Sequence, residues 1–207
     1  MKTKIKIENI PKESKLTGKL TGIKAFNTNT LSNDFCTKMR KTEAICKECY
    51  SAAMLQGVRQ NCVKPWERNS KIFSVTMEEE ALPIVNAHSF RFHAHGELIN
   101  YVHLENFMRI AKKNPFTIFA LWTKRIGFVR RWLKDNQIDN VIFIYSNPST
   151  EKVMNRPPKG FDKVFNAVYD DSIEEGQTLC TGKSCIDCMA CYRNNEHTVI
   201  VEKVKKR

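Results

Sequence analysis

The sequence predicts an α/β protein built as a partial (βα) barrel, or as the equivalent open sheet. Two continuous apolar runs, FTIFALWT at 116–123 and NVIFIYS at 140–146, are typical of parallel strands buried on both faces. An amphipathic stretch at 126–136 separates them, and a predicted strand at 89–97 and helix at 102–114 precede them. This strand–helix–strand–helix–strand order, with crossovers of about 25 residues, favours a parallel sheet.

The segments before this core are shorter and more polar. Residues 1–25 begin with the alternating KIKIENI, which predicts a strand, and 26–35 form a polar, turn-rich entry loop. Apolar residues then recur at helical spacing over 43–60. We therefore expect a helix there, with Cys46 and Cys49 at its start.

The remaining segments complete the alternation. The stretch 66–83 is predicted as a further helix that ends near Pro83. NPSTEKVMNRPPKG at 147–160 is the best candidate for a loop or hinge, since it is rich in turn-forming residues. FDKVFNAVYD at 161–170 and HTVIVEKVK at 197–205 predict two more strands.

The chain of 207 residues is long enough for one domain with a substantial core. We expect a single α/β domain comprising an N-terminal strand and entry loop at 1–35, a cysteine loop and βα core at 36–175, and a cysteine-rich segment with a final strand at 176–207. A hydrophobic content of 42%, with 12 Phe, indicates a folded globule rather than a disordered chain. The sequence does not indicate whether the protein is a monomer or an oligomer.

The compartment is predicted from what the sequence does not contain. No apolar run approaches the ~18 residues that span a bilayer, so no membrane association is expected. The N-terminus shows no continuous apolar segment of a secretory signal. We expect a reducing cytoplasm, where eight cysteines favour metal ligation over disulfides. The alternative is a secreted domain cross-linked by disulfides.

The net charge of +12, from 34 Lys and Arg against 22 Asp and Glu, favours an anionic partner, with nucleic acid first. The alternative is a basic protein whose charge serves only solubility. Three tryptophans and three arginines suggest a surface that stacks bases and binds phosphates: Trp66, Trp122, Trp132, Arg125, Arg130 and Arg131. The helical pattern places Trp132 in the core instead. Lys124 and Arg125, just beyond a strand end, are the better candidates for contact with an anionic substrate.

Four cysteines near the C-terminus form the second cysteine group: Cys180, Cys185, Cys188 and Cys191. Disulfides are a poor explanation, because partners two residues apart rarely reach bridging geometry. A metal centre fits short spacings better. The Cys-x4-Cys-x2-Cys-x2-Cys pattern favours a four-iron (4Fe-4S) cluster, with zinc and then a two-iron cluster as alternatives.

Three cysteines near the N-terminus form the first cysteine group: Cys36, Cys46 and Cys49. Three thiolates can hold three corners of a 4Fe-4S cluster and leave the fourth iron open to a ligand. An open position is what chemistry needs, as at catalytic zinc. Cys62 is the alternative fourth ligand, which would close the set and make it structural.

A competing metal site is suggested by RFHAHGE at 91–97. Alternating residues of a strand point to the same face, so His93, His95 and Glu97 can converge on one metal that activates water. Further ligands would have to come from later strands, where few remain. The simpler alternative is one histidine buried and hydrogen-bonded while the other faces solvent.

CxxCY followed by a helix resembles the cluster loop of radical S-adenosylmethionine enzymes. The usual Cys-x3-Cys-x2-Cys spacing is x9 and x2 here, which is similar to a branch represented by the elongator catalytic subunit. Gly96–Glu97 is similar to the GGE motif of that superfamily, with His95 in place of its first glycine. The resemblance implies a partial barrel, one or two 4Fe-4S clusters and S-adenosylmethionine.

The resemblance also implies roles for individual residues. The cofactor-binding candidates are Tyr50, Gly96, Glu97 and Ser146, the last at a strand end where a ribose contact is expected. The catalytic candidates are Glu97, Lys124 and Ser146. The second cysteine group is similar to the auxiliary-cluster extensions of these enzymes.

A further resemblance covers most of the chain. A GKLTGIKAFNTNT entry is followed by the CxxCY loop, a WERN segment, RFHAHGELIN, the YVHLENFMRIAKKNP helix, FALWTK and the final cysteines. This order resembles the phage-encoded "gene product eighty-eight" domain family. The acid of a His-x-x-Gly-Asp stretch in that family is Glu97 here.

The residues and the resemblances together support three functions. The first is an iron–sulfur protein like the radical S-adenosylmethionine enzymes, acting on nucleic acid or another anionic substrate. The second is a non-enzymatic protein of a phage or mobile element, in which structural metal centres hold a surface that binds nucleic acid or a host complex. The third is a metal-dependent hydrolase that uses His93, His95 and Glu97.

Overall fold

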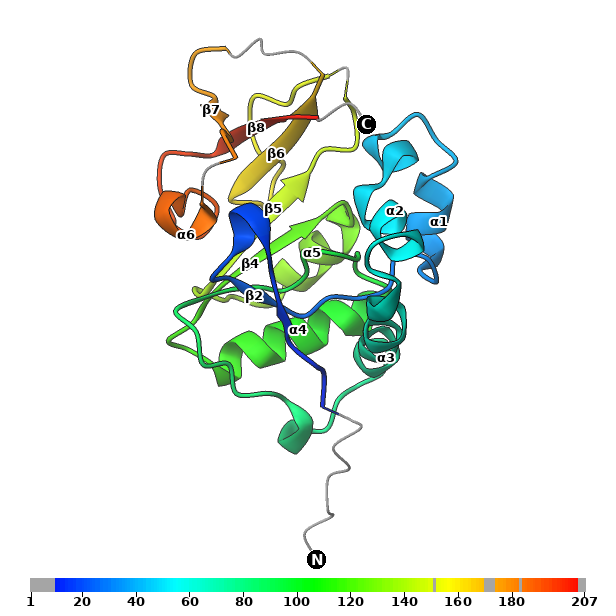
Figure 1. Ribbon diagram of the computed structural model, residues 1–207. Coiled ribbons are helices and arrows are strands. Elements are labelled where there is room, and N and C mark those ends of the chain that lie inside the picture. Colours follow the sequence, from blue (N-terminus) through cyan, green and yellow to red (C-terminus); the bar gives the residue numbers. More distant parts are fainter. Residues whose placement is uncertain (1–9, 151, 170–173, 183, 205–207) are drawn as a thin grey trace, which may run out of the picture.

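The computed structural model describes residues 10–150, 152–169, 174–182 and 184–204 (Figure 1). Its strands join one eight-stranded open sheet in the order β1-β2-β3-β4-β5-β6-β8-β7. β1 pairs antiparallel with β2, and every other neighbouring pair is parallel. The strands are β1 (Ser14–Lys15), β2 (Lys24–Ala25), β3 (Ser89–Arg91), β4 (Ile118–Thr123), β5 (Val141–Ser146), β6 (Lys163–Val168), β7 (Thr178–Leu179) and β8 (Val199–Lys203).

The expected α/β class is thereby confirmed, with a mostly parallel sheet. The described α-helices are α1 (Asp34–Met39), α2 (Tyr50–Gln56), α3 (Val63–Phe73), α4 (Tyr101–Lys113), α5 (Ile126–Leu133) and α6 (Cys185–Cys188). Short 3-10 turns are η2 (Gly18–Leu20), η3 (Ile45–Glu48), η4 (Gln60–Cys62) and η5 (Glu79–Ala81). No described helix is long and apolar enough to cross a membrane.

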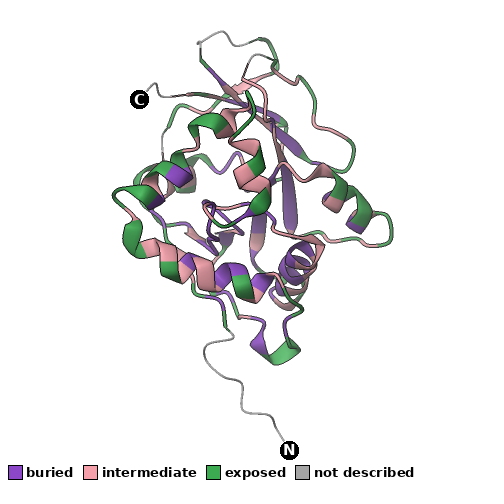
Figure 2. Cartoon of the chain, turned by 90° about the vertical axis from the view of Figure 1, so that its right-hand side faces the viewer, coloured by how far each residue is buried: buried purple, intermediate pink, exposed green. Residues whose placement is uncertain are grey.

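The helices α4 and α5 cover one face of the sheet. Successive side chains of a strand point to opposite faces, and in β4 Phe119 and Leu121 point to the face that these helices cover. They pack with Phe107 of α4 and Trp132 of α5 in the helix-side core. Figure 2 shows this buried layer through the strands and along the inner side of the helices.

The opposite face of the sheet is covered by loops and the C-terminal segment. Ala120 and Trp122 of β4 point to this face, where they meet Met189 and Tyr192, which follow α6. We call this the loop-side core. Because both faces are covered, the central strands are continuously apolar, which explains why β4 and β5 are so clear in the sequence.

Several elements coincide closely with the sequence pattern. Helix α4 fills the stretch expected at 102–114, and Asn100 caps it by accepting a hydrogen bond from the His103 amide (2.9 Å). The strands expected at 116–123, 140–146, 161–170 and 197–205 correspond to β4, β5, β6 and β8, and α5 lies within 126–136. The strand expected from KIKIENI lies outside the described residues except for Ile10.

The single helix expected over 66–83 is wrong in its extent. Helix α3 ends at Phe73, and the following apolar residues enter the helix-side core as an irregular segment. Side-chain amides replace the missing helical hydrogen bonds: the Met77 amide donates to Asn106 Oδ1 (3.1 Å) and the Val85 amide to Asn114 Oδ1 (2.7 Å). Tertiary contacts therefore hold an apolar pattern that looks helical in isolation.

The strand expected over 89–97 is also shorter than predicted, because β3 ends at Arg91. Beyond it, the amides of Ala94 and His95 both donate to Asn27 Oδ1 at 2.9 Å. One side chain thus takes the place of a neighbouring strand. The chain leaves the sheet here and turns towards Glu97.

Candidate functional site

The carboxyl ends of three adjacent parallel strands bring together the polar residues that the sequence predicts. Glu97 lies in the loop after β3, Lys124 follows β4 directly, and Ser146 ends β5. In open α/β sheets, ligands bind outside the carboxyl ends of the strands. This strand-end edge is therefore the part of the fold best placed to bind a ligand.

The Glu97 carboxylate is buried and holds two strand ends together. One of its oxygens accepts from Thr123 Oγ1 (2.6 Å) and the Leu98 amide (2.7 Å), and the other accepts from the Lys124 amide (2.8 Å). Most of its hydrogen-bonding capacity is thus used inside the protein. Glu97 positions the start of the segment after β4, whatever else it contacts.

The neighbouring cations extend this network outward. Lys124 Nζ donates to Ser146 Oγ at 2.7 Å, which links the ends of β4 and β5. The amide of Arg125 donates to Thr123 Oγ1 (2.9 Å), so the Arg125 backbone is held by the same hydrogen-bond network as the Glu97 carboxylate. Two of the three expected catalytic residues are therefore in direct contact, and the third binds the same turn.

Three hydrogen bonds hold the first cysteine group over this edge. Asn33 caps α1 by accepting from the amides of Phe35 (3.0 Å) and Cys36 (3.3 Å), while its own amide donates to the Glu97 carbonyl (2.9 Å). The Ile45 amide donates to the Pro148 carbonyl at 2.8 Å, beyond β5. The Tyr50 hydroxyl donates to the Ala94 carbonyl. The loop is thereby fixed to the segments after β3 and β5.

The thiols of the first cysteine group lie within electrostatic range of one another and of the strand-end residues. Burial raises the pKa of Cys36, and the charges of Glu97, Cys49 and Cys46 raise it further. Burial also raises the pKa of Cys46, against the opposing effect of the Lys124 ammonium. In the metal-free chain these two groups are neutral thiols, so a metal that binds them must displace protons.

Cys62 stands at a different point of the fold. It ends η4 directly before α3, and its thiol contacts the side chain of Asn61 (3.6 Å). The thiols with the strongest influence on Cys36 and Cys46 include Cys49 but not Cys62. Its membership of a metal site stays a prediction.

Gly96 is required by a close approach of two loops. Its φ of +113° lies in a region that favours glycine, and a Cβ there would meet the Thr28 side chain and lie 3.0 Å from the Thr28 carbonyl oxygen. The Thr28 amide also donates to the His95 carbonyl (3.0 Å). The loop after β2 therefore packs against the loop after β3 through this glycine.

The predicted convergence of His93, His95 and Glu97 is wrong, because these residues lie beyond the end of β3. His93 Nε2 bonds the Trp122 carbonyl (2.6 Å), whereas His95 Nδ1 bonds Ser51 Oγ (3.0 Å) with its ring 4.6 Å from that of Trp66. Both histidines are buried. Burial lowers the pKa of His93 and lowers that of His95 to about 3.

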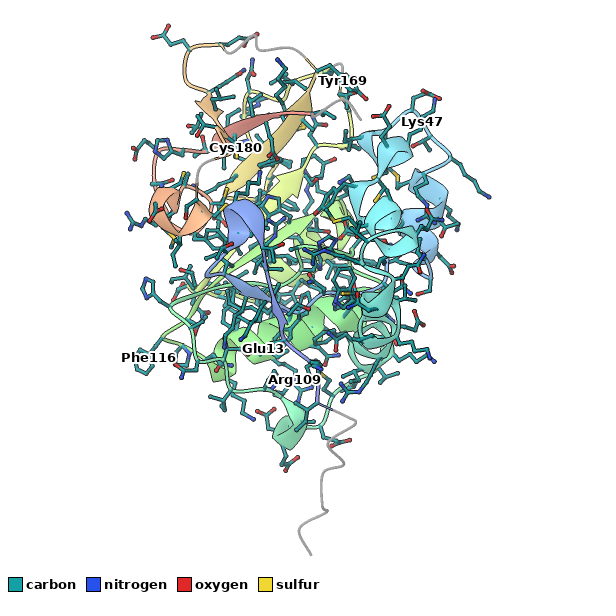
Figure 3. All side chains as sticks on the ribbon, in the orientation of Figure 1. Glu13, Lys47, Arg109, Phe116, Tyr169 and Cys180 are labelled. Atoms are coloured by element: carbon teal, nitrogen blue, oxygen red, sulfur yellow. The ribbon has the colours of Figure 1, made fainter. Side chains whose placement is uncertain are left out.

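The second cysteine group lies beside the loop-side core; in Figure 1 its helix α6 is at the left of the view, and α1 and α2 are at the right. Lys47 lies between Cys46 and Cys49 in the sequence, and in Figure 3 it is far from Cys180. The Cys180 amide donates to the Val201 carbonyl (2.7 Å), and α6 carries Cys185 and Cys188. Met189 reverses the chain in a left-handed conformation (φ 54°) before Cys191.

Among the described residues, three cations influence this second group electrostatically. Lys19 Nζ lies 3.6 Å from Cys180 Sγ. The positive charge of Arg91 opposes the rise in the pKa of Cys185 and Cys191, and Lys163 interacts electrostatically with Cys191. Burial raises the pKa of Cys191 to about 12, against the effect of Arg91. The cations favour the thiolate forms and would offset the negative charge of a tetrathiolate centre.

The fit of these thiols to a metal depends on the size of the centre. Among the described residues, no group of three His, Cys, Asp or Glu side chains is arranged to hold a metal ion. Around a single zinc the sulfurs would have to stand about 3.8 Å apart, given Zn–S bonds of about 2.3 Å in a tetrahedron. A cluster inserts its own iron and sulfide ions between the thiolates, so it tolerates a wider set. That either cysteine group binds a metal centre stays a prediction.

Two residues of the site were not predicted from the sequence. Asn33 ties the cysteine helix to Glu97, and its signal is the Asn-Asp pair at a helix start. Arg91 stacks on Trp122, with Cζ 3.8 Å from the ring centroid, and acts on the second cysteine group. Its signal is the FRF alternation, which places Arg91 on the face opposite Phe90 and Phe92.

The fold and site define a mixed α/β protein with an open, mostly parallel sheet, one cysteine group at its strand-end edge and another beside its loop-side core. The chain belongs to the Gene product 88 family, whose model matches residues 2–206. This confirms the phage gene-product family expected from the sequence, and the family description states no activity. No curated protein and no solved structure matches the chain.

Proposed function

We propose that this protein is an iron–sulfur protein, resembling radical S-adenosylmethionine enzymes, that acts on nucleic acid or another anionic substrate in a reducing host cytoplasm. One observation carries the proposal: the first cysteine group lies over the carboxyl ends of the parallel strands, beside Glu97, Lys124 and Ser146. Glu97, Lys124 and Ser146 also link the strand ends, whereas a sheet of this kind needs no thiols beside them.

The strand order supports the comparison with a partial barrel. β2 to β6 are neighbours in sequence order, and α4 and α5, the crossover helices after β3 and β4, lie on one face. A doubly wound sheet would reverse its order and place helices on both faces. Sequential order with crossover helices on one side is the arrangement from which a βα barrel is built.

The edge also offers space and unpaired polar atoms. A hollow of about 360 Å³ lies between the cysteine loop and the segment after β5, and it is lined by Met39, Glu43, Ala44, Pro148, Ser149 and Thr150. Its volume is in the range of small-ligand sites. Close to the edge, three buried polar atoms of the described residues have no hydrogen-bond partner: Asn27 Nδ2, Thr28 Oγ1 and His93 Nδ1. Buried polar atoms are usually hydrogen-bonded, so these three are available to water or a ligand.

The chain's residues have distinct expected roles. Cys36, Cys46 and Cys49 would hold a 4Fe-4S cluster, which when bound supplies electrons and an iron position for S-adenosylmethionine. Tyr50 fixes α2 beside this group, and Ser146, held by Lys124, presents a hydroxyl at the edge. The Glu97 carboxylate positions the Lys124 turn, and most of its oxygen lone pairs already accept hydrogen bonds from the protein. Any direct contact with a cofactor would use the lone pairs that are left.

The test is the iron, sulfide and zinc content of anaerobically purified protein, with absorption spectra before and after addition of S-adenosylmethionine. About four irons per cluster with matching sulfide, and a spectrum perturbed by the cofactor, would support the proposal. Zinc without sulfide would overturn it.

Variants separate the two cysteine environments. Cys46→Ala is expected to abolish the spectral response to S-adenosylmethionine while leaving the protein folded by circular dichroism. Cys62→Ala is the control, since Cys62 is not one of the three thiols proposed to hold the cluster, and it should keep the response. If both variants behave alike, the assignment of the first group is wrong.

A second candidate is a non-enzymatic protein with structural metal centres that binds nucleic acid or a host complex. The observation in its favour is that Met189 and Tyr192, beside the second cysteine group, cover one face of the sheet. A metal there would contribute to folding directly. Steeply salt-dependent nucleic-acid binding that S-adenosylmethionine leaves unchanged, in protein that contains zinc, would support this candidate instead.

A further inference from the structure

A row of alternating cations and aromatic rings lies beside the first cysteine group. Arg125 is stacked between Phe35 of α1 and Phe128 of α5, with Cζ 4.7 Å and 4.0 Å from the two ring centroids. Phe128 meets Tyr101 of α4 edge-on at 6.0 Å, and Arg131 Cζ lies 3.9 Å from the Tyr101 ring. We call this row the cation–aromatic ladder: Phe35, Arg125, Phe128, Tyr101 and Arg131.

The ladder is not the surface expected from the tryptophans. Trp66, Trp122 and Trp132 are all buried, so none of them can stack a base as the sequence suggested. The placement of Trp132 in the core is confirmed. The rings of the ladder, in contrast, are all partly exposed, and Arg131 is exposed.

The two guanidiniums keep their donors available. Among the described residues, neither Arg125 nor Arg131 has a carboxylate within ion-pair distance, and neither side chain donates a hydrogen bond. The rings hold the guanidinium planes, which leaves their N–H edges free for phosphate oxygens. Arginines held in this way lose little freedom when they bind an anion.

We propose that the cation–aromatic ladder is a binding surface for single-stranded nucleic acid that leads to the first cysteine group. Phosphates would bind the guanidinium edges, and unpaired bases would stack on the ring faces that the guanidiniums leave free. The paired bases of a duplex are not free to stack in this way. An acidic peptide or an anionic lipid surface would use the charges but gain nothing from three rings. The net charge of +12 agrees with an anionic partner.

The direction of the ladder links it to the proposed function. It begins at Phe35, next to Cys36 in α1, and at Arg125, whose pKa is influenced by the charges of Glu97 and Cys36. From there it runs along α5 and the start of α4. A strand on it would therefore end near the thiols. The role of that strand as substrate rests on the proposed function, whereas binding itself does not.

The test measures binding of a labelled single-stranded oligonucleotide to the full-length protein, by fluorescence anisotropy over a series of salt concentrations. Arg131→Ala should lower the magnitude of the slope of log K against log salt by about 0.7, the value for one phosphate contact on a single strand. Phe128→Leu keeps an apolar side chain but removes the ring, and should weaken binding by about tenfold with the slope unchanged.

The control is Lys112→Ala, which removes another exposed cation that lies over a ring, 5.4 Å from that of Trp132. Lys112 is about 16 Å along α4 from Tyr101, at 1.5 Å per residue. This variant should bind like the unaltered protein. All three variants are checked for folding by circular dichroism.

Equal binding of all variants would overturn the proposal, as would preference for a duplex, an acidic peptide or anionic vesicles over the single strand. An effect of Arg131→Ala without one of Phe128→Leu would overturn the stacking of bases. If the protein carries no iron but the ladder variants lose binding as expected, the surface stands and the proposed iron–sulfur function fails.

Discussion

At the scale of single residues, the buried Glu97 carboxylate is the centre of the strand-end edge. It joins the loop after β3 to Thr123 and the Lys124 amide. Glu97→Gln leaves one acceptor oxygen and places an NH2 group opposite a donor. We expect a loss of about 1–3 kcal/mol in the free energy of unfolding, measured by urea denaturation.

The matched control for this prediction is Glu43→Gln. Glu43 is exposed and pairs with Lys47 one helical turn away. Such surface pairs contribute little, so this variant should unfold like the unaltered protein. A Glu97→Gln protein as stable as the control would mean that the carboxylate network does not contribute to the free energy of unfolding.

The buried imidazole of His95 gives a pH dependence with a definite sign. Its pKa is lowered to about 3 by burial, with smaller effects from Arg59 and Arg91, whereas an unfolded histidine titrates near pH 6.5. The unfolded state therefore takes up a proton first as the pH falls. Stability is full above about pH 6.5 and is lost towards pH 3, at up to about 1.4 kcal/mol per pH unit for this residue.

The share of His95 is measured by comparing urea denaturation of the unaltered protein and His95→Gln between pH 7 and pH 5. In the variant, the free energy of unfolding should fall less steeply with pH, by up to about 1.4 kcal/mol per pH unit, the slope for one proton. His88→Gln, which removes an exposed imidazole, serves as the control. Parallel curves for His95→Gln and the unaltered protein would contradict the assignment.

At the scale of elements, the contact between the loops after β2 and β3 depends on Gly96. Gly96→Ala would place a Cβ against Thr28 at a φ of +113°, so we expect a loss on the order of 2–4 kcal/mol in the free energy of unfolding. Gly127→Ala is the opposite case, because its Cβ meets nothing within 4 Å and it lies in α5. That variant should gain about 0.5–1 kcal/mol.

Thermal and urea denaturation of both glycine variants decides this prediction. The two changes add the same methyl group, so their opposite signs isolate the effect of backbone conformation and space. If Gly96→Ala is neutral, the loops after β2 and β3 can separate without cost, and the edge is less rigid than described.

The elements that the sequence predicts well are those whose pattern is set by the sheet itself. β4 and β5 are apolar on both faces because Phe119 faces the helices and Ala120 faces the loops. The errors occur where a single side chain replaces regular hydrogen bonding. Asn27 ends β3 early, and Asn106 and Asn114 hold the segment after α3 without a helix. No local pattern reveals these partners, because they are distant in the sequence.

The site shows the same division. The strand-end positions of Lys124 and Ser146 follow from the strands, and the sequence places them correctly. The failed convergence of His93, His95 and Glu97 follows from the same Asn27 contacts, which remove the alternation. The ladder was missed because its rings come from three helices, and only the crossing of those helices brings them together.

At the scale of the whole molecule, the sheet depends on its second covering layer. Tyr192 is buried against Trp122, with ring centroids 5.8 Å apart, and Arg91 lies beside both. Tyr192→Ala is expected to cost about 3–5 kcal/mol in the free energy of unfolding and to change the near-ultraviolet circular dichroism of Trp122. Tyr169→Ala is the control, because Tyr169 is 41% exposed and its removal should change stability little.

A Tyr192→Ala protein that unfolds within about 1 kcal/mol of the Tyr169→Ala control would show that the C-terminal segment is an optional cover rather than part of the core. Guanidinium denaturation of the two variants side by side gives the answer. The expected result is one cooperative transition for both, with a lower midpoint for Tyr192→Ala.

The two outermost strands, β1 and β7, have only two residues each. An edge this short offers few unpaired amides to another chain, which protects an open sheet against aggregation. β7 shields β8, whose Val199, Ile200 and Val201 are buried and rich in β-branched side chains. Detachment of β7 would expose the backbone edge of β8 at Ile200 and Val201, while the other edge of β8 stays paired with β6. We therefore expect the second cysteine group to limit edge-to-edge association as well as to cover the loop-side core.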